Sequence, residues 1–359
     1  MTTKHPFISL CLIVRDEEAS LHQCLDSVQG AYDELIVVDT GSMDRTVEIA
    51  REFGARIEAF EWGDDFSAAR NHACSLARGT WIAMIDGDEC LAPAGIGPRL
   101  PAMLRQVPGH VDKLLIEQRT LVGQGSVSLL VDRVFRNTSR LRWKYRIHEV
   151  LETPLNRTAK THDVYLLHDN ALKRKADLTI GREREAMYLR ALALDMEDHP
   201  DDPRPAFYFA STLYGAGRDQ EAMEAYEHYF GLSEDREPVR RAVAFRDAAA
   251  VAGRLGDLGR RRHLLFRSVE NDWRSSETYQ ALSDLALEHE NLDEAIHWMS
   301  IAADCPHTGS EMHWSSWATG AALWRKLAGL YRRKGEDRTA HLCDQRAESL
   351  QDEPFPDSG

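Results

Sequence analysis

Two carboxylates follow directly on an apolar stretch in the segment TWIAMIDGDE, residues 80–89. Asp86 and Asp88, separated by Gly87, can reach one divalent cation from a strand end and the turn after it. Oxygen ligands of this kind suit Mg²⁺ or Mn²⁺, which often share them with a diphosphate. The alternative is an ordinary acidic turn that closes a strand. Because other strand ends in this chain are acidic too, we favour the metal site.

A second carboxylate ends an apolar stretch in VVDTGSMDRT, residues 37–46. Asp39 lies at the end of this stretch, and Gly41 and Ser42 form a turn before a predicted helix. A carboxylate in this position can accept the N3–H of a uracil ring, while the amides at a helix N-terminus suit anions. Asp44 is well placed to cap the helix, but capping leaves Asp39 unexplained.

The segment DDFSAARN, residues 64–71, supplies positive charge. Arg70 follows Phe66 by one helical turn, so both share a helix face. A guanidinium can hold diphosphate oxygens in a bidentate manner. The alternative is a surface arginine paired with Asp64 or Asp65.

Two histidines stand in strand-like surroundings, in RIHEV at residues 146–150 and in YLLHDN at residues 165–170. Glu149 follows His148, and His168 ends an apolar stretch. The chemical pair that this pattern offers is a carboxylate base and an imidazole metal ligand. An ordinary structural role for either histidine stays open.

Strand-like and helix-like segments alternate through the first part of the chain, and this order predicts an α/β fold with a mostly parallel, doubly wound sheet. The strands are expected at 7–14, 34–39, 56–62 and 80–86, and the helices at 17–28, 44–54 and 66–79. Ligands of such sheets bind beyond the carboxyl ends of the strands. The polar clusters RDEE, DTGS and DGDE all follow strands, so we expect them at one edge of the sheet.

The chain changes character after this α/β region. Residues 112–122 and 126–137 are predicted to be paired strands around a GQGS turn. From residue 174 the chain is helical, with a degenerate repeat of small and large residues typical of tetratricopeptide helix pairs. The repeat copies lie at 207–230, 279–303 and 324–347, with a weaker copy at 242–269. We expect domains at 1–173 and 174–351 and a disordered tail at 352–359.

Composition limits the function further. The net charge of −14 over 359 residues argues against nucleic-acid binding, which needs a cationic face. The six cysteines form no CxxC pair, so neither a disulfide framework nor a zinc site is expected, and a reducing compartment fits. No apolar stretch approaches the length of a membrane span, and the N-terminus is a poor signal peptide. We therefore expect a cytoplasmic protein.

Several of these motifs together resemble the family 2 glycosyltransferases of the GT-A fold. The strings are LIVRDEE, ELIVVDTGSMDRTVEIA, DDFSAARN and WIAMIDGDE. They are most similar to a bacterial branch that carries C-terminal tetratricopeptide repeats and includes the sublancin-type peptide S-glycosyltransferases. The similarity extends over roughly residues 7–170 and more loosely over the repeats. It implies a GT-A domain at 1–173 and a tetratricopeptide-like domain at 174–351.

The resemblance also implies roles for individual residues. Ile13, Arg15 and Glu17 would flank the nucleoside, and Asp39 would bind its base. Arg70 would bind the diphosphate, and Asp86 would lie near the ribose or the metal. Asp88 and His168 would ligate the metal, and Glu149 would be the general base. His148 is the fallback base, because imidazole titrates nearer neutrality. Two positions depart from the branch: Asp16 replaces an asparagine, and HDNAL replaces His-x-Gly-Tyr.

These observations predict an inverting, metal-dependent glycosyltransferase that uses a nucleotide-sugar donor, with a UDP-sugar favoured and Mg²⁺ or Mn²⁺ as the metal. The acceptor could be a peptide or protein, or a cell-envelope glycan or lipid-linked sugar. The helical repeats could hold the acceptor or form a homodimer. A non-catalytic adaptor is the alternative from another class. A nucleotidyltransferase would usually have a Gly-rich loop after its first strand, and LIVRDEEAS has none.

Overall fold

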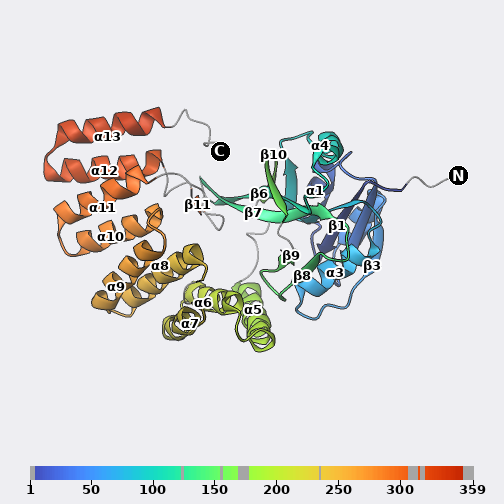
Figure 1. Ribbon diagram of the computed structural model, residues 1–359, viewed down its shortest axis with the longest axis horizontal. Helices are drawn as coiled ribbons and strands as arrows, with labels where there is room; N and C mark the ends of the chain where they lie inside the picture. The colour runs from blue at the N-terminus through green and yellow to red at the C-terminus, as the bar shows by residue number, and fades with distance from the viewer. Residues whose placement is uncertain are drawn as a thin grey trace. The chain divides into compact units, whose positions relative to one another are not determined.

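The structure is a computed structural model, and it describes residues 5–122, 125–153, 157–168, 178–233, 236–305, 314–315 and 320–350. The chain divides into two compact units, Met1–Asp195 and Met196–Gly359 (Figure 1). The boundary predicted after residue 173 and the tail predicted at 352–359 both lie outside the described residues.

The first unit begins with the predicted alternation of strands and helices. Its elements in this part are β1 (Ile8–Val14), α1 (Leu21–Ser27), β2 (Glu34–Asp39), α2 (Thr46–Glu52), β3 (Arg56–Ala59), α3 (Phe66–Leu76) and β4 (Trp81–Asp86). The later elements are β5 (Glu89–Ala92), the 3₁₀ turn η1 (Gly97–Arg99), α4 (Leu100–Gln106), β6 (Lys113–Val122), β7 (Gly125–Arg136), β8 (Arg142–Lys144), β9 (Val150–Glu152), β10 (Thr158–His168) and α5 (Leu178–Asp198).

The main sheet has the order β3-β2-β1-β4-β7-β6-β10-β5. Strands β3, β2, β1 and β4 are parallel to one another, as their βα alternation predicts. Beyond them the sheet is mixed, because β7 runs antiparallel to both β4 and β6. The predicted pairing of residues 112–122 with 126–137 is confirmed as the β6–β7 pair. A separate antiparallel pair is formed by β8 and β9.

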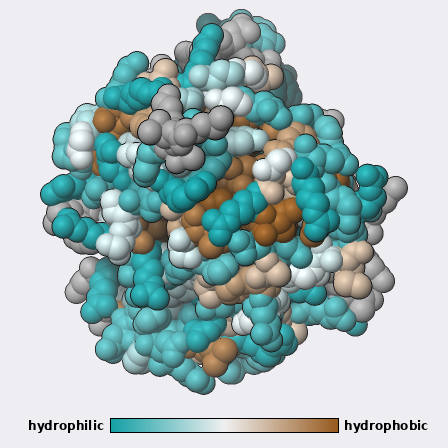
Figure 2. All heavy atoms as spheres, turned by 90° about the vertical axis from the view of Figure 1, so that its right-hand side faces the viewer, coloured by the Kyte–Doolittle hydropathy of each residue, from teal (hydrophilic) through white to brown (hydrophobic). Residues whose placement is uncertain are grey.

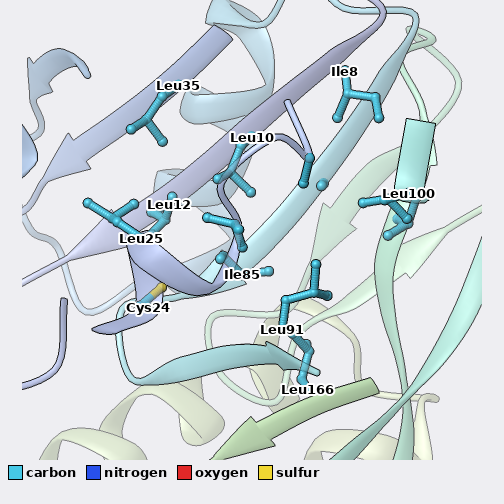
Figure 3. Close-up of a cluster of buried hydrophobic side chains, with 14 of the residues drawn as sticks. Ile8, Leu10, Leu12, Cys24, Leu25, Leu35, Ile85, Leu91, Leu100 and Leu166 are labelled. Carbon is cyan, nitrogen blue, oxygen red and sulfur yellow. The ribbon is translucent and has the colours of Figure 1, made fainter. Parts of the chain in front are cut away.

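Alternate residues of β1 enter two hydrophobic cores, one on each face of the sheet. Leu10 and Leu12 pack with Leu25 of α1 in the cluster drawn in Figure 3. Cys11 and Ile13 belong to the other cluster, which includes alanines of α3. Helices therefore cover both faces, as the doubly wound prediction requires.

The second unit consists of successive helix pairs, seen stacked in Figure 1. The pairs are α6 (Pro203–Gly215) with α7 (Asp219–Leu232), α8 (Pro238–Arg254) with α9 (Leu258–Asn271), α10 (Ser276–Glu288) with α11 (Leu292–Asp304), and α12 (Ala321–Lys334) with α13 (Asp337–Ser349). A two-residue strand, β11 (Trp314–Ser315), precedes α12. The alanines at the predicted repeat positions are buried, among them Ala210, Ala295 and Ala340, whereas the predicted glycines Gly217 and Gly335 are exposed in loops. The weaker copy at 242–269 forms a complete pair.

The loop inside each helix pair ends the first helix in the same way. In three loops the left-handed position is a glycine, Gly217, Gly256 or Gly335, with φ between 72° and 84°. In the α10–α11 loop the residue is Glu290, with φ of 56°. The following N–H then bonds a carbonyl five residues back, as in Asn291 to Ala286 at 2.9 Å. This is the Schellman arrangement, in which a residue with a Cβ is strained.

We predict that Glu290→Gly stabilises the protein by about 1 kcal/mol, because it removes the Cβ from a left-handed position. The measurement is chemical denaturation followed by the helical circular dichroism signal. Glu290→Ala is the matched control, since it removes the carboxylate and keeps the Cβ. Gly335→Ala should destabilise by a similar amount, because open space surrounds its added Cβ and only backbone strain changes. Equal stability of all three variants and the parent would contradict this explanation.

The remaining general expectations can be compared with the structure. The six cysteines all lie within the described residues and are not disulfide-bonded, and Cys11 and Cys24 are buried in the first unit. Among the described helices, none combines the length and the apolar character that crossing a membrane requires. Seen from the side on which β3 and α3 lie, the surface is largely hydrophilic, with an apolar area near its centre (Figure 2).

Candidate active site

The carboxyl ends of three parallel strands lie side by side at one edge of the sheet. In the register of the sheet, Asp39 of β2 is opposite Val14 of β1, and Asp86 of β4 is opposite Ile13 of β1. Two acidic strand ends therefore flank the end of β1, where the chain leaves the sheet. The expectation that DTGS and DGDE lie at the same edge as RDEE is met.

Arg70 of α3 is the centre of the site. Asp65 caps α3 by accepting the N–H of Ala68 at 2.8 Å, which orients the first turns of the helix. The side chain of Arg70 is buried; its Nε donates to Glu149 at 2.6 Å and its Nη2 to Asp86 at 2.9 Å. The alternative of a surface arginine paired with Asp64 or Asp65 is wrong. Arg70, Asp86 and Glu149, far apart in sequence, are brought together.

A second buried arginine, which the sequence interpretation missed, completes the network. Nη2 of Arg133, on β7, donates to Asp86 at 2.5 Å and to Glu89 at 2.9 Å. Glu89 is fully buried, accepts the backbone N–H of Asp86 at 2.9 Å, and also bonds the amide of Gln118. Both oxygens of Asp86 are thus bonded to guanidinium groups.

The charges in this network decide the protonation of its acids. Burial alone would raise the pKa of Asp86, but Arg133 and Arg70 outweigh it and hold that pKa well below its usual range. Glu89 differs, because burial and the negative charge of Asp86 raise its pKa despite Arg133. Asp86 is therefore the permanent counter-ion of the two arginines.

Asp88 and His168 form a separate pair beside this network. His168 Nε2 lies 3.0 Å from an oxygen of Asp88, and its Nδ1 lies 3.4 Å from the hydroxyl of Thr120. The hydrogen bond with Asp88 raises the pKa of His168. Within the residues that the structure describes, no group of three His, Cys, Asp or Glu is assembled as a metal site. Mg²⁺ is often held by one or two carboxylates plus substrate phosphates, and Asp88 is one such carboxylate, whereas imidazole is the less usual ligand for this cation.

The loops after β1 and β2 are bonded to each other. The N–H of Asp16 donates to Ser42 Oγ at 3.1 Å, and Asp16 accepts the N–H of Met43 at 2.7 Å. The N–H of Glu17 donates to Thr46 Oγ1 at 2.7 Å. Asp16 has φ of 53°, a conformation that asparagine and aspartate both tolerate. The departure from asparagine at this position is thus compatible with the local backbone.

The residues predicted to flank a nucleoside lie on these loops and strand ends. Asp39 is half-buried and accepts the N–H of Ser42 at 3.1 Å. Ile13 is buried, and Arg15 is exposed at the end of β1. Glu17 lies against the DGDE turn, since a Cβ added at Gly87 would be 3.1 Å from its Cγ. Asp44 accepts the N–H of Thr46, the first residue of α2, but the N-cap of this helix is Arg45, so the prediction of Asp44 as the N-cap is wrong by one residue.

Glu149 and its fallback His148 lie in the connection between β8 and β9, residues 145–149, which we call the 145–149 loop. His148 is exposed, whereas Glu149 is half-buried against Arg70. Tyr145 and His148 have φ of 70° and 52°, and each such residue costs about 1–2 kcal/mol. The loop contains no glycine, so contacts from outside it must maintain this conformation. Of the segment HDNAL, which replaces the His-x-Gly-Tyr of the related branch, only His168 lies within the described residues.

Sequence signals for the missed residues exist. Arg133 lies inside the apolar stretch LLVDRVF, where a buried charge needs a partner. Asp195 lies on the apolar face of α5 with Ala191 and Leu192, and it is also buried. A charged residue at a position that helical periodicity assigns to the core is the pattern that would have found Asp195, whereas β7 shifts register at Arg133 and its periodicity breaks there.

Part of this site lies in a region that matches a known protein family. Residues 9–112 match the family model described as glycosyl transferase family 2. That range contains the ends of β1, β2 and β4 and all of α3. The chain therefore carries a family 2 glycosyltransferase domain, followed by tetratricopeptide-like helix pairs, as the motifs predict.

The relatives include one protein named for tetratricopeptide repeats and one named as a glycosyltransferase. A TPR repeat-containing protein of Synechococcus elongatus is 35% identical over 262 residues, 70% of this chain and 63% of that protein. The glycosyltransferase SunS of Bacillus subtilis is 25% identical over 232 residues, 61% of this chain and 52% of that protein. The chain thus spans less than two thirds of the length of these curated relatives.

Similar solved structures include MamA from Desulfovibrio magneticus RS-1 and BtubC from P. vanneervenii. MamA is 17% identical, with 50% of this chain and 92% of that chain covered and a TM-score of 0.37. BtubC is 20% identical, with 52% and 81% covered and a TM-score of 0.40.

We predict that Arg133→Met destabilises the first unit by about 3–5 kcal/mol, because it leaves a buried carboxylate without its counter-ion. The measurement is denaturant unfolding followed by tryptophan fluorescence, since Trp81 and Trp143 are buried in this unit. Arg56→Met is the matched control. It removes an exposed ion pair with Glu58 on β3, which should contribute less than about 1 kcal/mol. Similar losses in the two variants would contradict the importance of the buried network.

Proposed function

We propose that the protein is a glycosyltransferase that moves a sugar from a nucleotide-sugar to an acceptor nucleophile, with a UDP-sugar as donor. The observation that carries this proposal is the network of Arg70, Asp86 and Glu149 at the carboxyl ends of the strands. It combines a buried cation for a leaving diphosphate with a carboxylate for a proton. The match of residues 9–112 to family 2 supports the same reaction class.

The donor would lie across the loops after β1 and β2. Asp39 would accept the N3–H of uracil, and the strand end around Ile13, Arg15 and Glu17 would line the nucleoside. Arg70 would hold the diphosphate. Arg70 donates to Glu149 and Asp86 through Nε and Nη2, whereas its Nη1 has no hydrogen-bond partner among the described residues. Nη1 would be the nitrogen that a diphosphate oxygen approaches.

The residues that would hold a divalent metal are Asp88 and His168, together with the diphosphate. Mg²⁺ or Mn²⁺ would supply positive charge for the leaving group. Both oxygens of Asp86 are engaged by arginines, so we assign its main role to holding Arg70 and Arg133 rather than to ligation. Asp86 as a direct ligand stays a prediction from the resemblance.

Glu149 would act as the general base. The acceptor O–H or S–H gives its proton to the carboxylate, and the lone pair of that oxygen or sulfur forms a bond to the anomeric carbon. The bond between this carbon and the diphosphate oxygen breaks, and its electrons leave with the nucleoside diphosphate. Attack from the opposite face inverts the anomeric configuration, as the family resemblance implies.

The acceptor is the least determined part of the proposal. We favour a peptide or protein side chain, because helix-pair repeats form concave surfaces that suit extended peptides. A glycan or lipid-linked sugar is the alternative, in which case the repeats would serve self-association. The name of the relative SunS says only that it is a glycosyltransferase.

We predict that Asp88→Asn removes the effect of Mn²⁺ on UDP-sugar binding, because a carboxylate ligand for the cation is lost. The measurement is thermal unfolding with UDP-glucose, with and without Mn²⁺. Asp163→Asn, an exposed change on the same strand as His168, is the matched control and should keep the full response. An Asp88→Asn variant with the parent's Mn²⁺ response would exclude Asp88 as a ligand.

We predict that Glu149→Gln lowers the rate of UDP release from a UDP-sugar by about 10²- to 10⁴-fold, the usual effect of losing a general base. UDP affinity should stay within a few-fold of the parent's, because the base acts on the nucleophile. Glu152→Gln is the matched control, since Glu152 is exposed on the same hairpin. If His148→Ala loses activity while Glu149→Gln keeps it, the two residues exchange roles.

A further inference from the structure

The 145–149 loop is held by two helices outside its own hairpin. From α3, the N–H of Phe66 donates to the carbonyl of Arg146 at 2.8 Å, and the hydroxyl of Ser67 donates to the carbonyl of Tyr145. These bonds fix the start of the loop to the helix that also carries Arg70. They leave the N–H and the side chain of Arg146 to be bonded from elsewhere.

The second helix is α5, and its contact is ionic. The N–H of Arg146 donates to Asp195 Oδ2 at 2.8 Å, and its Nη1 donates to Asp195 Oδ1 at 2.8 Å. Only 1% of Asp195 is exposed, so water cannot replace this arginine as its partner. Both carboxylate oxygens are thereby directed at one residue of the loop.

The same helix touches the loop a second time. The ring centroid of Tyr188 lies 6.1 Å from that of His148, edge to face. Tyr188 and Asp195 are seven residues apart, about two turns, and so share one face of α5. That face contacts the loop at both sides of Ile147. A further bond joins Arg190 of α5 to Asp64, just before α3, at 3.1 Å.

We propose that Asp195 is a positioning residue for Glu149. Through Arg146 it maintains the left-handed conformations at Tyr145 and His148, and these place the Glu149 carboxylate against Arg70. The inference rests on the proposed function in one respect, which is that Glu149 is the base. Asp195 lies on α5, the helix that continues into the second unit and ends at Asp198.

A purely structural role would predict a different pattern. Loss of a structural bond lowers the stability and weakens every activity of the folded protein together. Loss of positioning lowers turnover and leaves donor binding intact, because the bonds of Asp195 in the described part of the chain go to Arg146. Rate and nucleotide affinity must therefore be measured in the same variants.

The experiment uses the full chain with UDP-glucose and UDP-N-acetylglucosamine in Mn²⁺. We expect Asp195→Asn to lower UDP release by about 10- to 100-fold, the effect of a small misplacement of a reacting group. UDP affinity should change by less than about twofold in the same variant. Arg146→Gln changes the partner of Asp195, which is the more exposed residue of the pair. It should lower UDP release and keep UDP affinity to the same extent as Asp195→Asn. Glu197→Gln, an exposed change on the same helix, is the control and should match the parent.

Coupling to Glu149 is tested in the double variant. In a Glu149→Gln background, Asp195→Asn should lower the rate by less than about a further twofold, because the group that it positions is gone. If Asp195→Asn lowers the rate by the same factor in the Glu149→Gln background as in the parent, or also lowers UDP affinity, the positioning role is overturned.

Hydrogen exchange gives a readout that needs no turnover. Peptides covering residues 142–152 should exchange faster in Asp195→Asn and unchanged in Glu197→Gln. Unchanged exchange in Asp195→Asn overturns the inference, whether or not either donor is turned over. A Glu149→Gln variant with the parent's rate instead overturns the base assignment in the proposed function, so the two failures are distinguishable.

Discussion

A guanidinium group that is removed from water needs anionic partners, and the first unit contains two such groups side by side. Burying an unpaired charge costs several kcal/mol, so Arg70 and Arg133 can be buried only with Asp86 between them and with Glu89 and Glu149 at the outer positions. These bonds join α3, β4, β7 and the 145–149 loop. The constraint therefore connects the stability of the unit to the geometry of its candidate site.

The same network separates two kinds of acid in the site. Asp86 and Glu89 are enclosed by arginine and glutamine donors and are occupied by the fold. Asp88 and His168 are bonded to each other, and Glu149 is bonded to Arg70 alone of the two arginines. Asp86 and Glu89 therefore hold the two arginines in place, while Asp88, His168 and Glu149 have fewer bonds to them.

Much of the α/β part could be predicted from the sequence, because short apolar stretches and helical spacing are local signals. The strand ends carrying Asp39 and Asp86 followed from the parallel order, and Arg70 and Glu149 from motif resemblance. Arg133 could not be placed, since it lies on an antiparallel strand whose neighbours are set by long-range pairing. Asp195 was missed because it follows the expected boundary at residue 173, and the positive φ values at Tyr145 and His148 leave no trace in residue type. In the repeat loops, a glycine can indicate the left-handed residue of the Schellman arrangement, whereas Glu290 gives no such indication.

If the strand-end cluster binds a nucleotide-sugar, the ligand must stabilise the folded protein, and this stabilisation can be measured directly. Thermal unfolding of the full chain would be followed with UDP-, GDP-, CDP- and TDP-glucose, each with and without Mn²⁺. We expect the UDP-sugar to stabilise the protein most, by about 2.7 kcal/mol at one hundred times its Kd, and to do so more strongly with Mn²⁺. The absence of stabilisation by all four donors at millimolar concentration, with Mn²⁺ present, would contradict the account.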